Sequence, residues 1–485
     1  MNLLKLCNKE KCFESSKRFF SIGKKLFSNG EVDSGRRDVL DDFESTVENL
    51  VPRNQRITGT PHQVFIIQPY IKWGPQKLRN TTPELQLEES VALVKTLPGW
   101  KVVDTKIMST ISFDKKAFFN SGNLTMLSQL VNKRKEITAV FINVKHLQLH
   151  QHLALENTFG IPVFDRYGIV INIFKRHAKT KEAKLQVALA QLPYFWSRIK
   201  GIHNEEESFT PNVGIGSETF QHIRLRLLKE QESKIKKELS TLAKSRVILR
   251  SKRKEMKLPT VAIVGYTNAG KTSLIKCLTE SESLEPEDKL FATLDVTVHE
   301  GMLDNRLKVL YVDTIGFISD VPSNLIEPFV VTLEDAVQAD LIVHVQDVSH
   351  PDRKAQYDEV VRTINSLDVS EKVMNNIITV CNKCDRVDDI DAISDDSVIY
   401  TSCKDGTGLD ELKATIERRL FATTDLAKMK IRVSSGSEEY HWLFKEAAVS
   451  DVVPDEKDQQ FVLLTVTIHK VKLAKFKHKF IKQKN

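Results

Sequence analysis

The sequence is poor in cysteine and lacks long apolar runs. Six cysteines in 485 residues are too few for a disulfide framework and favour a reducing compartment. No stretch approaches the roughly 18 consecutive apolar residues of a membrane-spanning helix, so we expect no membrane segment. With 41% apolar and 28% charged residues, a wholly disordered or collagen-like chain is also excluded. The length predicts about three domains.

Positive charge is only slightly in excess overall, but it is concentrated locally. The net charge is +7, whereas residues 1–30, 221–257 and 470–485 carry +5, +9 and +7, so the rest of the chain is acidic. Such basic patches attract phosphate polymers. For any single patch, the alternative is an ordinary solvated face.

The first basic patch has the composition of a mitochondrial leader. Residues 1–30 are rich in Lys, Arg, Leu, Phe and Ser and poor in acids, as amphipathic transit peptides are. The segment 18–21, Arg-Phe-Phe-Ser, also resembles a mitochondrial processing site. We therefore expect leader and linker over 1–58 and a location in the mitochondrial matrix. The alternative is a basic tail on a cytoplasmic protein.

Strand-like and helical segments alternate over residues 62–200, which predicts an α/β domain, assigned to 59–216. The expected strands are 101–107, 137–144, 161–164 and 168–174, and the expected helices are 85–97, 124–131, 147–156 and 183–196.

The segment 217–257 contains no Gly or Pro and predicts a basic helix or helical hairpin. Leu228, Ile235, Leu242 and Leu249 recur every seven residues, which gives a narrow apolar stripe. Because the heptads are few, we expect an intramolecular helical pair in a monomer rather than a coiled-coil dimer.

Short apolar runs that end at polar residues predict a parallel sheet over 258–424. The runs are 260–264, 309–312, 341–345 and 377–380. A short strand–helix–strand unit with a lysine-rich tail follows, and we assign a small α+β domain to 425–485.

The first of these runs leads directly into a phosphate-binding motif. The segment 265–272 fits G-x-x-x-x-G-K-[ST] and lies between a strand and a helical run, the context that the motif requires. Lys271 is expected to reach the β- and γ-phosphates, and Thr272 to hold Mg²⁺. The predicted nucleotide-binding residues of this loop are Gly265, Tyr266, Thr267, Asn268, Ala269, Gly270, Lys271, Thr272 and Ser273.

Three further motifs follow in the order found in guanine-nucleotide-binding domains. Asp313 and Gly316 form an Asp-x-x-Gly element, in which the carboxylate positions Mg²⁺ and the glycine N–H meets the γ-phosphate. Asp385 can accept two hydrogen bonds from guanine that adenine cannot donate. The predicted base-binding residues are Asn382, Lys383, Asp385, Ser402, Cys403 and Lys404. The fold class is therefore α/β: a parallel-sheet P-loop GTPase domain, an N-terminal α/β domain, a basic helical linker and a small C-terminal domain.

Two other clusters have weaker functional readings. Cys381 and Cys384 form a C-x-x-C, but both flank the guanine motif and no second cysteine pair accompanies them. His146, His150 and His152 share an expected helix without further ligands. We expect neither cluster to hold a metal.

The chain resembles the HflX GTPases. The resemblance rests on the loop 265–271, on Phe-Ala-Thr-Leu-Asp at 291–295 and on Asp-Thr-Ile-Gly-Phe at 313–317. Outside that domain it rests on Leu-Glu-Glu at 87–89, Phe-Asp-Arg at 164–166 and the run 184–192. It covers about residues 62–470, and with the leader it is most similar to the family's mitochondrial branch.

The resemblance implies a GTP/GDP-dependent switch that acts on the large ribosomal subunit and its rRNA. It implies Thr293 as the switch threonine that closes on Mg²⁺ and the γ-phosphate, with Thr297 as runner-up. The expected catalytic residues are Lys271, Thr293, Asp313 and Gly316, and the expected Mg²⁺ ligands are Thr272, Thr293 and Asp313.

Some residues depart from the patterns of related GTPases. Phe317 stands where Ras-like proteins place a water-orienting glutamine, so we expect slow intrinsic hydrolysis that a partner stimulates. The family's long glycine-rich loop is reduced to 213–218, after acidic residues at 205–207. The family's Gly-Lys-Gly-Lys element is replaced by 119–124, which has no basic residue.

Three functions remain open from the sequence. The first is a GTPase that splits or recycles ribosomes. The second is an assembly factor or RNA chaperone for the large subunit. The third is a GTPase that works without RNA, for instance at a membrane, which the basic helix disfavours.

Overall fold

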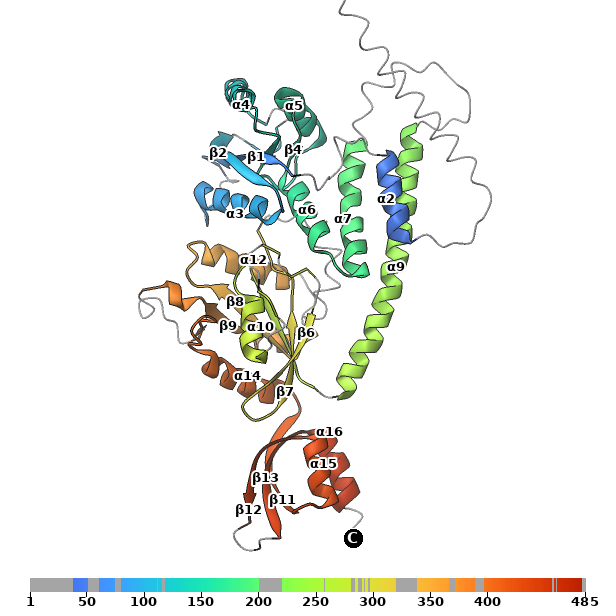
Figure 1. Ribbon diagram of the computed structural model, residues 1–485, viewed down its shortest axis with the longest axis vertical. Coiled ribbons are helices and arrows are strands. Elements are labelled where there is room, and N and C mark those ends of the chain that lie inside the picture. The colour runs from blue at the N-terminus through green and yellow to red at the C-terminus, as the bar shows by residue number, and fades with distance from the viewer. Residues whose placement is uncertain are drawn as a thin grey trace, which may run out of the picture.

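The computed structural model describes residues 38–50, 61–74, 80–110, 112–115, 118–199, 220–256, 258–280, 284–286, 290–291, 293–294, 297–319, 338–365, 371–388, 397–455, 458 and 460–481. Figure 1 shows two α/β domains stacked along the long axis, a small C-terminal domain at the far end and a long helix beside them. Among the helices of these ranges, none is both long and apolar enough to cross a membrane. The expected leader (residues 1–30) and the segments 205–207 and 213–218 lie outside the described residues.

The N-terminal domain is a parallel sheet covered by helices on both faces. Its strand order is β2-β1-β3-β4, and every pairing is parallel. Successive residues of β1 alternate between two cores: Val64 and Ile66 face one, Phe65 and Ile67 the other. The elements are β1 (Gln63–Ile71), α3 (Pro83–Thr96), β2 (Lys101–Thr110), α4 (Ser121–Lys133), β3 (Ala139–Ile142), α5 (Leu149–Phe159), β4 (Val163–Phe164) and α6 (Arg166–His177).

Helix α6 corrects the strand expected at 168–174. Residues 166–174 are all buried, so no exposed face marks a helical period, and periodicity cannot distinguish helix from strand. The local signal was the cap: Asp165 accepts a hydrogen bond from Gly168 N at 2.8 Å and so starts the helix.

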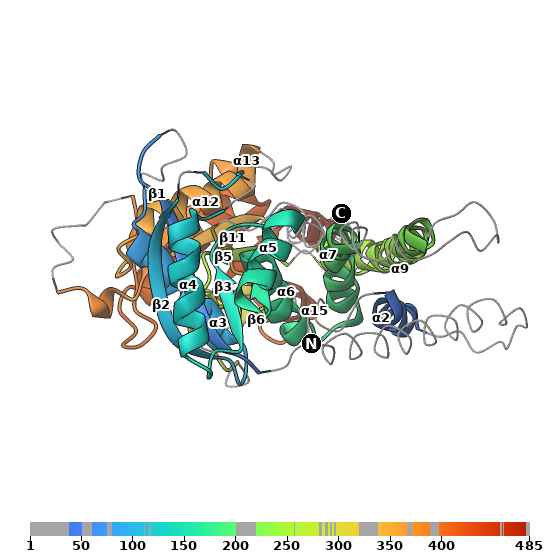
Figure 2. The same cartoon turned by 90° about the horizontal axis from the view of Figure 1, so that it is seen from above.

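The helical region is larger than expected. Helix α9 (Phe220–Met256) is one continuous helix that packs against α7 (Lys181–Ile199) and α2 (Val39–Leu50), not a hairpin within 217–257. Both views show these three helices together at one side of the molecule (Figures 1 and 2). Part of the expected linker is therefore helix α2. Its Phe43 is buried, and its Asp42 accepts hydrogen bonds from Gln231 and Lys234 of α9.

The second α/β domain is a six-stranded sheet of order β10-β9-β8-β5-β7-β6. Only β6 runs antiparallel among these paired strands. The carboxyl ends of the parallel strands therefore share one edge, where ligands bind in such sheets. The elements are β5 (Thr260–Gly265), α10 (Lys271–Thr279), β6 (Thr297–Met302), β7 (Lys308–Asp313), β8 (Leu341–Asp347), α12 (Arg353–Asn365), α13 (Glu371–Met374), β9 (Ile378–Asn382), the 3₁₀ helix η3 (Cys384–Arg386), β10 (Ile399–Tyr400) and α14 (Leu409–Thr423).

The C-terminal domain is an antiparallel sheet of order β11-β13-β12 packed on helices. Its elements are β11 (Leu426–Ser434), α15 (Glu438–Glu446), β12 (Ala448–Pro454), β13 (Phe461–His469), α16 (Lys470–Phe476) and the π-helix η5 (Lys477–Ile481). The sequence reading missed the edge strand β12, which a register shift between Val449 and Asp451 interrupts. Lys470, Lys472 and Lys479 of the lysine-rich tail form ion pairs with acidic groups, which reduces its free charge.

Candidate functional site

A tight loop between β5 and α10 forms the floor of the site. Gly270 has a φ of 94°, and a Cβ there would lie 2.2 Å from Asn382 Nδ2. Asn382 Nδ2 donates to Ala269 O at 3.0 Å, which ties the loop to β9. Free N–H groups at the start of α10 are suited to anions. The pocket here is lined by Thr267, Asn268, Gly270, Lys271, Thr272, Ser273, Pro286, Phe291, Thr293 and Gly316.

Lys271 is a buried cation in this pocket. Only 7% of its surface is exposed, and burial lowers its pKa to about 8. Its Nζ donates to Tyr266 O at 2.9 Å. Gly316 lies close by: a Cβ there would be 3.0 Å from Lys271 Nζ and 2.7 Å from Thr267 Cγ2. A side chain at 316 would intrude on the space that a phosphate group needs.

Three oxygen-bearing side chains meet at the end of β7. Asp313 Oδ2 accepts from Thr272 Oγ1 at 2.8 Å and from Thr293 Oγ1 at 3.1 Å. Burial raises the pKa of Asp313, against the effect of nearby Lys271. Asp313 Oδ1 is buried and has no hydrogen-bond partner among the described residues. Hard oxygen donors and an orphaned carboxylate oxygen fit a divalent cation such as Mg²⁺.

The alternative switch threonine lies elsewhere. Thr297 begins β6, is exposed, and its Oγ1 is 2.8 Å from His299 Nε2. The arrangement around Asp313 therefore favours Thr293 over Thr297.

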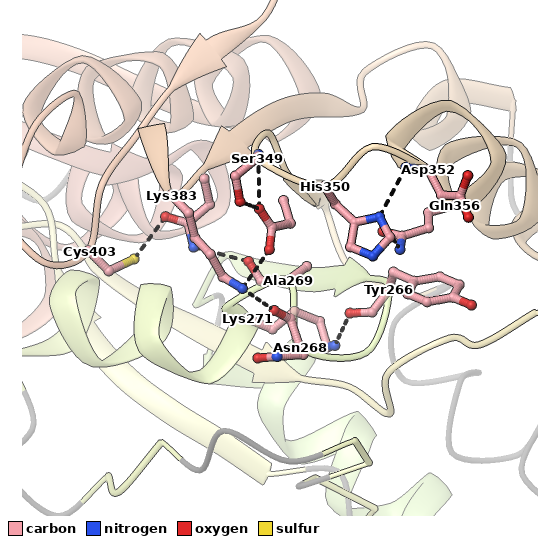
Figure 3. Close-up of polar contacts among 12 residues, drawn as sticks. Tyr266, Asn268, Ala269, Lys271, Ser349, His350, Asp352, Gln356, Lys383 and Cys403 are labelled. Carbon is pink, nitrogen blue, oxygen red and sulfur yellow. Dashed lines mark hydrogen bonds and ion pairs between the residues drawn. The ribbon is translucent and has the colours of Figure 1, made fainter. Parts of the chain in front are cut away.

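The second half of the site lies at the ends of β9 and β10. Lys383 Nζ donates to Asn268 O at 2.7 Å and to Asp347 Oδ2 at 2.6 Å, and Figure 3 shows Lys383 lying against the loop that also holds Lys271. Burial acts to raise the pKa of Asp347, but bonds from Lys383 and Ser349 outweigh it and lower the pKa. Lys383 thus connects the ends of β8 and β9 to the phosphate loop through hydrogen bonds.

Asp385 lies at this second half with its carboxylate held in place. Ser402 Oγ donates to Asp385 Oδ1 at 2.9 Å, and Ser402 Oγ also accepts from Lys404 N at 3.3 Å. A carboxylate fixed in this way can accept from a base bearing two adjacent donors. The neighbouring Cys403 is not a reactive thiol, since burial and nearby Cys277 raise its pKa to about 12.

Residues of the two weaker clusters are buried or paired with carboxylates. Cys381 and Cys384 are both buried. His146 pairs with Asp165 at 3.1 Å, and His152 with Glu156 at 3.1 Å. In the part of the chain that the structure describes, no group of three or more His, Cys, Asp or Glu could hold an ion.

Phe317 lies beside the phosphate loop and is packed into the core. Its N donates to Gly265 O at 3.1 Å, its O accepts from Thr267 N at 2.7 Å, and its side chain is buried. The segment after Asp-x-x-Gly is thereby paired with the phosphate loop.

Sequence reasoning missed several residues around the site. Asp347 ends an apolar strand, just as Asp313 does, and that position could have marked it. Glu89, whose side chain contacts Tyr266, and Phe174, whose ring contacts Phe291, belong to the other domain. No local pattern predicts such contacts.

Comparisons with known proteins agree with this geometry. Residues 260–383 match a family described as 50S ribosome-binding GTPase. Residues 177–253, which include α7 and most of α9, match the GTP-binding GTPase middle region, and residues 84–175 match the corresponding N-terminal region.

Individual relatives cover most of the chain. GTP-binding protein 6 of Xenopus laevis is 41% identical, over 91% of this chain and 85% of that protein. GTPase HflX of Caldanaerobacter subterraneus subsp. tengcongensis is 33% identical, over 76% of this chain and 86% of that protein. A solved GTP-binding protein from Sulfolobus solfataricus in complex with GDP is 23% identical, over 74% of this chain and 99% of that chain, with a TM-score of 0.39.

The fold and the site define a P-loop GTPase, an enzyme that binds GTP and hydrolyses it to GDP. More particularly, the chain belongs to the HflX family of GTPases, and GTP-binding protein 6 proteins are among its homologues. The resemblance found in the sequence is thereby confirmed, as is the predicted fold class.

Proposed function

We propose that this GTPase is a switch that acts on the large subunit of the mitochondrial ribosome and promotes ribosome splitting or recycling. In the proposed cycle, Lys271 and the N–H groups of 265–273 hold the phosphates. Asn382, Lys383, Asp385 and the 402–404 segment hold guanine. GTP hydrolysis then releases the segments that contain Thr293 and Gly316.

Mg²⁺ belongs to this proposal. Thr272, Thr293 and Asp313 would hold it, and when bound it would neutralise phosphate charge. Burial raises the pKa of Asp313. A cation beside the orphaned Oδ1 of this carboxylate would favour its ionised form.

The basic face of α9 is the observation that supports the large ribosomal subunit as the partner. Arg226, Lys229, Lys237 and Lys244 are exposed and fall within about 80° of the helix circumference. They lie opposite the apolar residues that pack on α2 and α7. Lys229, Lys237 and Lys244 form no ion pair with any residue that the structure describes. Arg226 lies 4.0 Å from Glu230. A line of exposed cations, three of them without an ion pair among the described residues, is suited to RNA phosphates.

The second candidate is an assembly factor or RNA chaperone for the same subunit. The basic face of α9 supports it equally, because shape and phosphates dominate recognition of structured RNA. Immature large subunits would then be the preferred partner. The protein would act as a monomer in both cases.

A mitochondrial location is supported by the composition of residues 1–30 alone. Import of a fluorescent fusion, with and without those residues, tests it. Cytoplasmic retention of the full-length fusion would contradict a matrix location.

The decisive experiment measures GTP turnover by the protein lacking residues 1–30, alone, with intact mitochondrial monosomes, and with purified mature or immature mitochondrial large subunits. Stimulation by monosomes supports splitting, and stronger stimulation by immature large subunits supports assembly. A fast rate that ribosomes do not change would overturn both proposals.

Two neighbouring lysines provide a matched test of the RNA surface. Lys237 is unpaired among the described residues, whereas Lys236 pairs with Glu232 at 2.6 Å. Lys237→Ala should reduce the salt dependence of large-subunit binding by about one phosphate contact. Lys236→Ala should change it less, and equal effects would argue against the basic face as the contact.

A further inference from the structure

The side chain of Tyr266 leaves the phosphate loop and enters the N-terminal domain. Its hydroxyl donates to Glu89 Oε1 of α3 at 2.6 Å. Figure 3 shows the ring pointing away from Lys271 and the base-binding half of the site. The loop that binds phosphates therefore carries a hydrogen bond to another domain.

Glu89 is itself held by a buried partner. Arg166, at the first turn of α6, pairs with Glu89 Oε1 through Nη2 at 3.0 Å, and its side chain is 3% exposed. Its Nη1 donates to Asn143 Oδ1 at 3.1 Å, and Asn143 Nδ2 donates to Gln68 Oε1 at 2.7 Å. The position of Glu89 is thus set by side chains in β1 and directly after β3, because buried polar networks hold their members in one arrangement.

The same hydroxyl holds the switch segment that follows Asp-x-x-Gly. Ser319 N donates to the Tyr266 hydroxyl at 2.7 Å, and Ser319 Oγ lies 2.9 Å from it. The hydroxyl proton goes to Glu89, so the lone pairs of that oxygen remain available to Ser319. Tyr266 therefore joins three parts: the phosphate loop, the switch segment 316–319 and the N-terminal domain.

We propose that Tyr266 is a positioning residue for GTP hydrolysis, and that Glu89 and Arg166 set its hydroxyl so that Gly316 is held where the γ-phosphate is bound. Gly316 lies between Asp313 and Phe317, and the backbone of Phe317 is hydrogen-bonded to the phosphate loop. Fixing Ser319 therefore limits the movement of Gly316. GDP has no γ-phosphate, so its binding does not depend on the position of Gly316. The N-terminal domain thus contributes to the distinction between GTP and GDP.

The protonation of the phenol is consistent with this role. Burial, and then the charge of Glu89, raise the pKa of Tyr266 well above its ordinary value. The hydroxyl therefore stays a donor to Glu89 throughout the working pH range.

The test compares two tyrosine-to-phenylalanine variants of the full chain. Tyr266→Phe should weaken binding of a non-hydrolysable GTP analogue about tenfold and lower kcat by a similar factor, because a hydrogen bond to a charged partner is lost. GDP affinity should change less than about twofold. Tyr311→Phe is the matched control: Tyr311 is buried in β7 and its hydroxyl has no partner among the described residues. It should alter neither affinity.

A structural defect would have a different signature from loss of positioning. If Tyr266→Phe weakens GDP and the GTP analogue equally, or weakens neither, the proposal is wrong. Glu89→Gln provides a second test that does not alter the phosphate loop: it too should weaken the analogue and spare GDP.

The double variant Tyr266→Phe/Glu89→Gln tests whether the two residues act together. If Glu89 acts through the tyrosine hydroxyl, the double variant should resemble Tyr266→Phe within about twofold. If the effects of the two single variants multiply in the double variant, the residues act independently, and the proposal that Glu89 acts through Tyr266 is wrong.

Discussion

The two ends of the nucleotide site differ in what surrounds them. The proposed guanine end is built within one domain: Asp385 is held by Ser402, and Lys383 by Asp347 and Asn268. The phosphate end is shared between domains, because Tyr266 bonds to Glu89 and Phe291 packs on Phe174 of α6, with ring centroids 4.8 Å apart.

The difference suits the two ends to different tasks: one end selects the base, and the other distinguishes GTP from GDP. GTP and GDP share the base and differ at the γ-phosphate, so only the phosphate end can report which nucleotide is bound. The side chains that contact the N-terminal domain belong to Tyr266 of the phosphate loop and to Phe291 of the pocket lining. Changes at the guanine end should therefore alter which nucleotide binds, and changes at the domain contact should alter the preference for GTP over GDP.

The largest effect is expected from Asp385→Asn. The amide should reject guanine and accept xanthine, which shifts the preference between the two bases by at least the order of a thousandfold. Competition binding with GDP and XDP measures it. The preference for tri- over diphosphate should survive when xanthine nucleotides are compared, and unchanged guanine selectivity would remove the assignment of Asp385.

Lys271→Ala should come next. Loss of the buried cation should weaken GTP and GDP binding roughly a hundredfold, because charge-assisted bonds to phosphate are removed. Equilibrium binding with a fluorescent nucleotide checks this. A normal GTPase rate in this variant would contradict the assignment of the phosphate end.

Phe174→Ala should have a smaller and more selective effect. Removing the ring that supports Phe291 should lower affinity for a GTP analogue several-fold while sparing GDP, since aromatic pairs add about 1 kcal/mol beyond area burial. Phe159→Ala is the matched control, because Phe159 of α5 is about as buried as Phe174, in the core on the other face of the sheet. If both variants change the GTP-to-GDP ratio alike, the contact has no specific role.

The smallest effect concerns pH and His344, in the strand beneath the phosphate loop. Burial, and then the charge of Lys271, lower its pKa to about 4. The unfolded state therefore binds more protons between about pH 6.5 and pH 4, and stability falls as pH falls through that window. Between pH 6.5 and 5 the loss should be about 2 kcal/mol.

His344→Gln cannot titrate and should lose correspondingly less stability over that interval. Urea unfolding of both proteins at pH 6.5 and 5 compares them. Parallel losses would show that His344 does not account for the acid sensitivity.

The guanine and phosphate motifs were readable from the sequence because each is a short segment with a fixed chemical task after a strand. The loop 265–272 lies at the end of β5, Asp313 ends β7 and Asp385 follows β9, as the apolar runs before them predicted. Helix α6 was misread because burial on all sides removes periodicity.

Helix α2 was also missed, because its partners lie far along the chain in α7 and α9. The Tyr266–Glu89 contact could not be predicted for the same reason: it depends on how two domains dock, which no local pattern encodes.

Hydrogen exchange of the unmodified protein tests the link between the phosphate end and the N-terminal domain most directly. Backbone amides of α3 and α6 would be followed with GDP and with a non-hydrolysable GTP analogue, both at saturation. Coupling through Tyr266 and Phe291 predicts slower exchange in α3 and α6 with the analogue than with GDP, and no difference in α4 and α5. Equal exchange of α3 and α6 in the two complexes would contradict it.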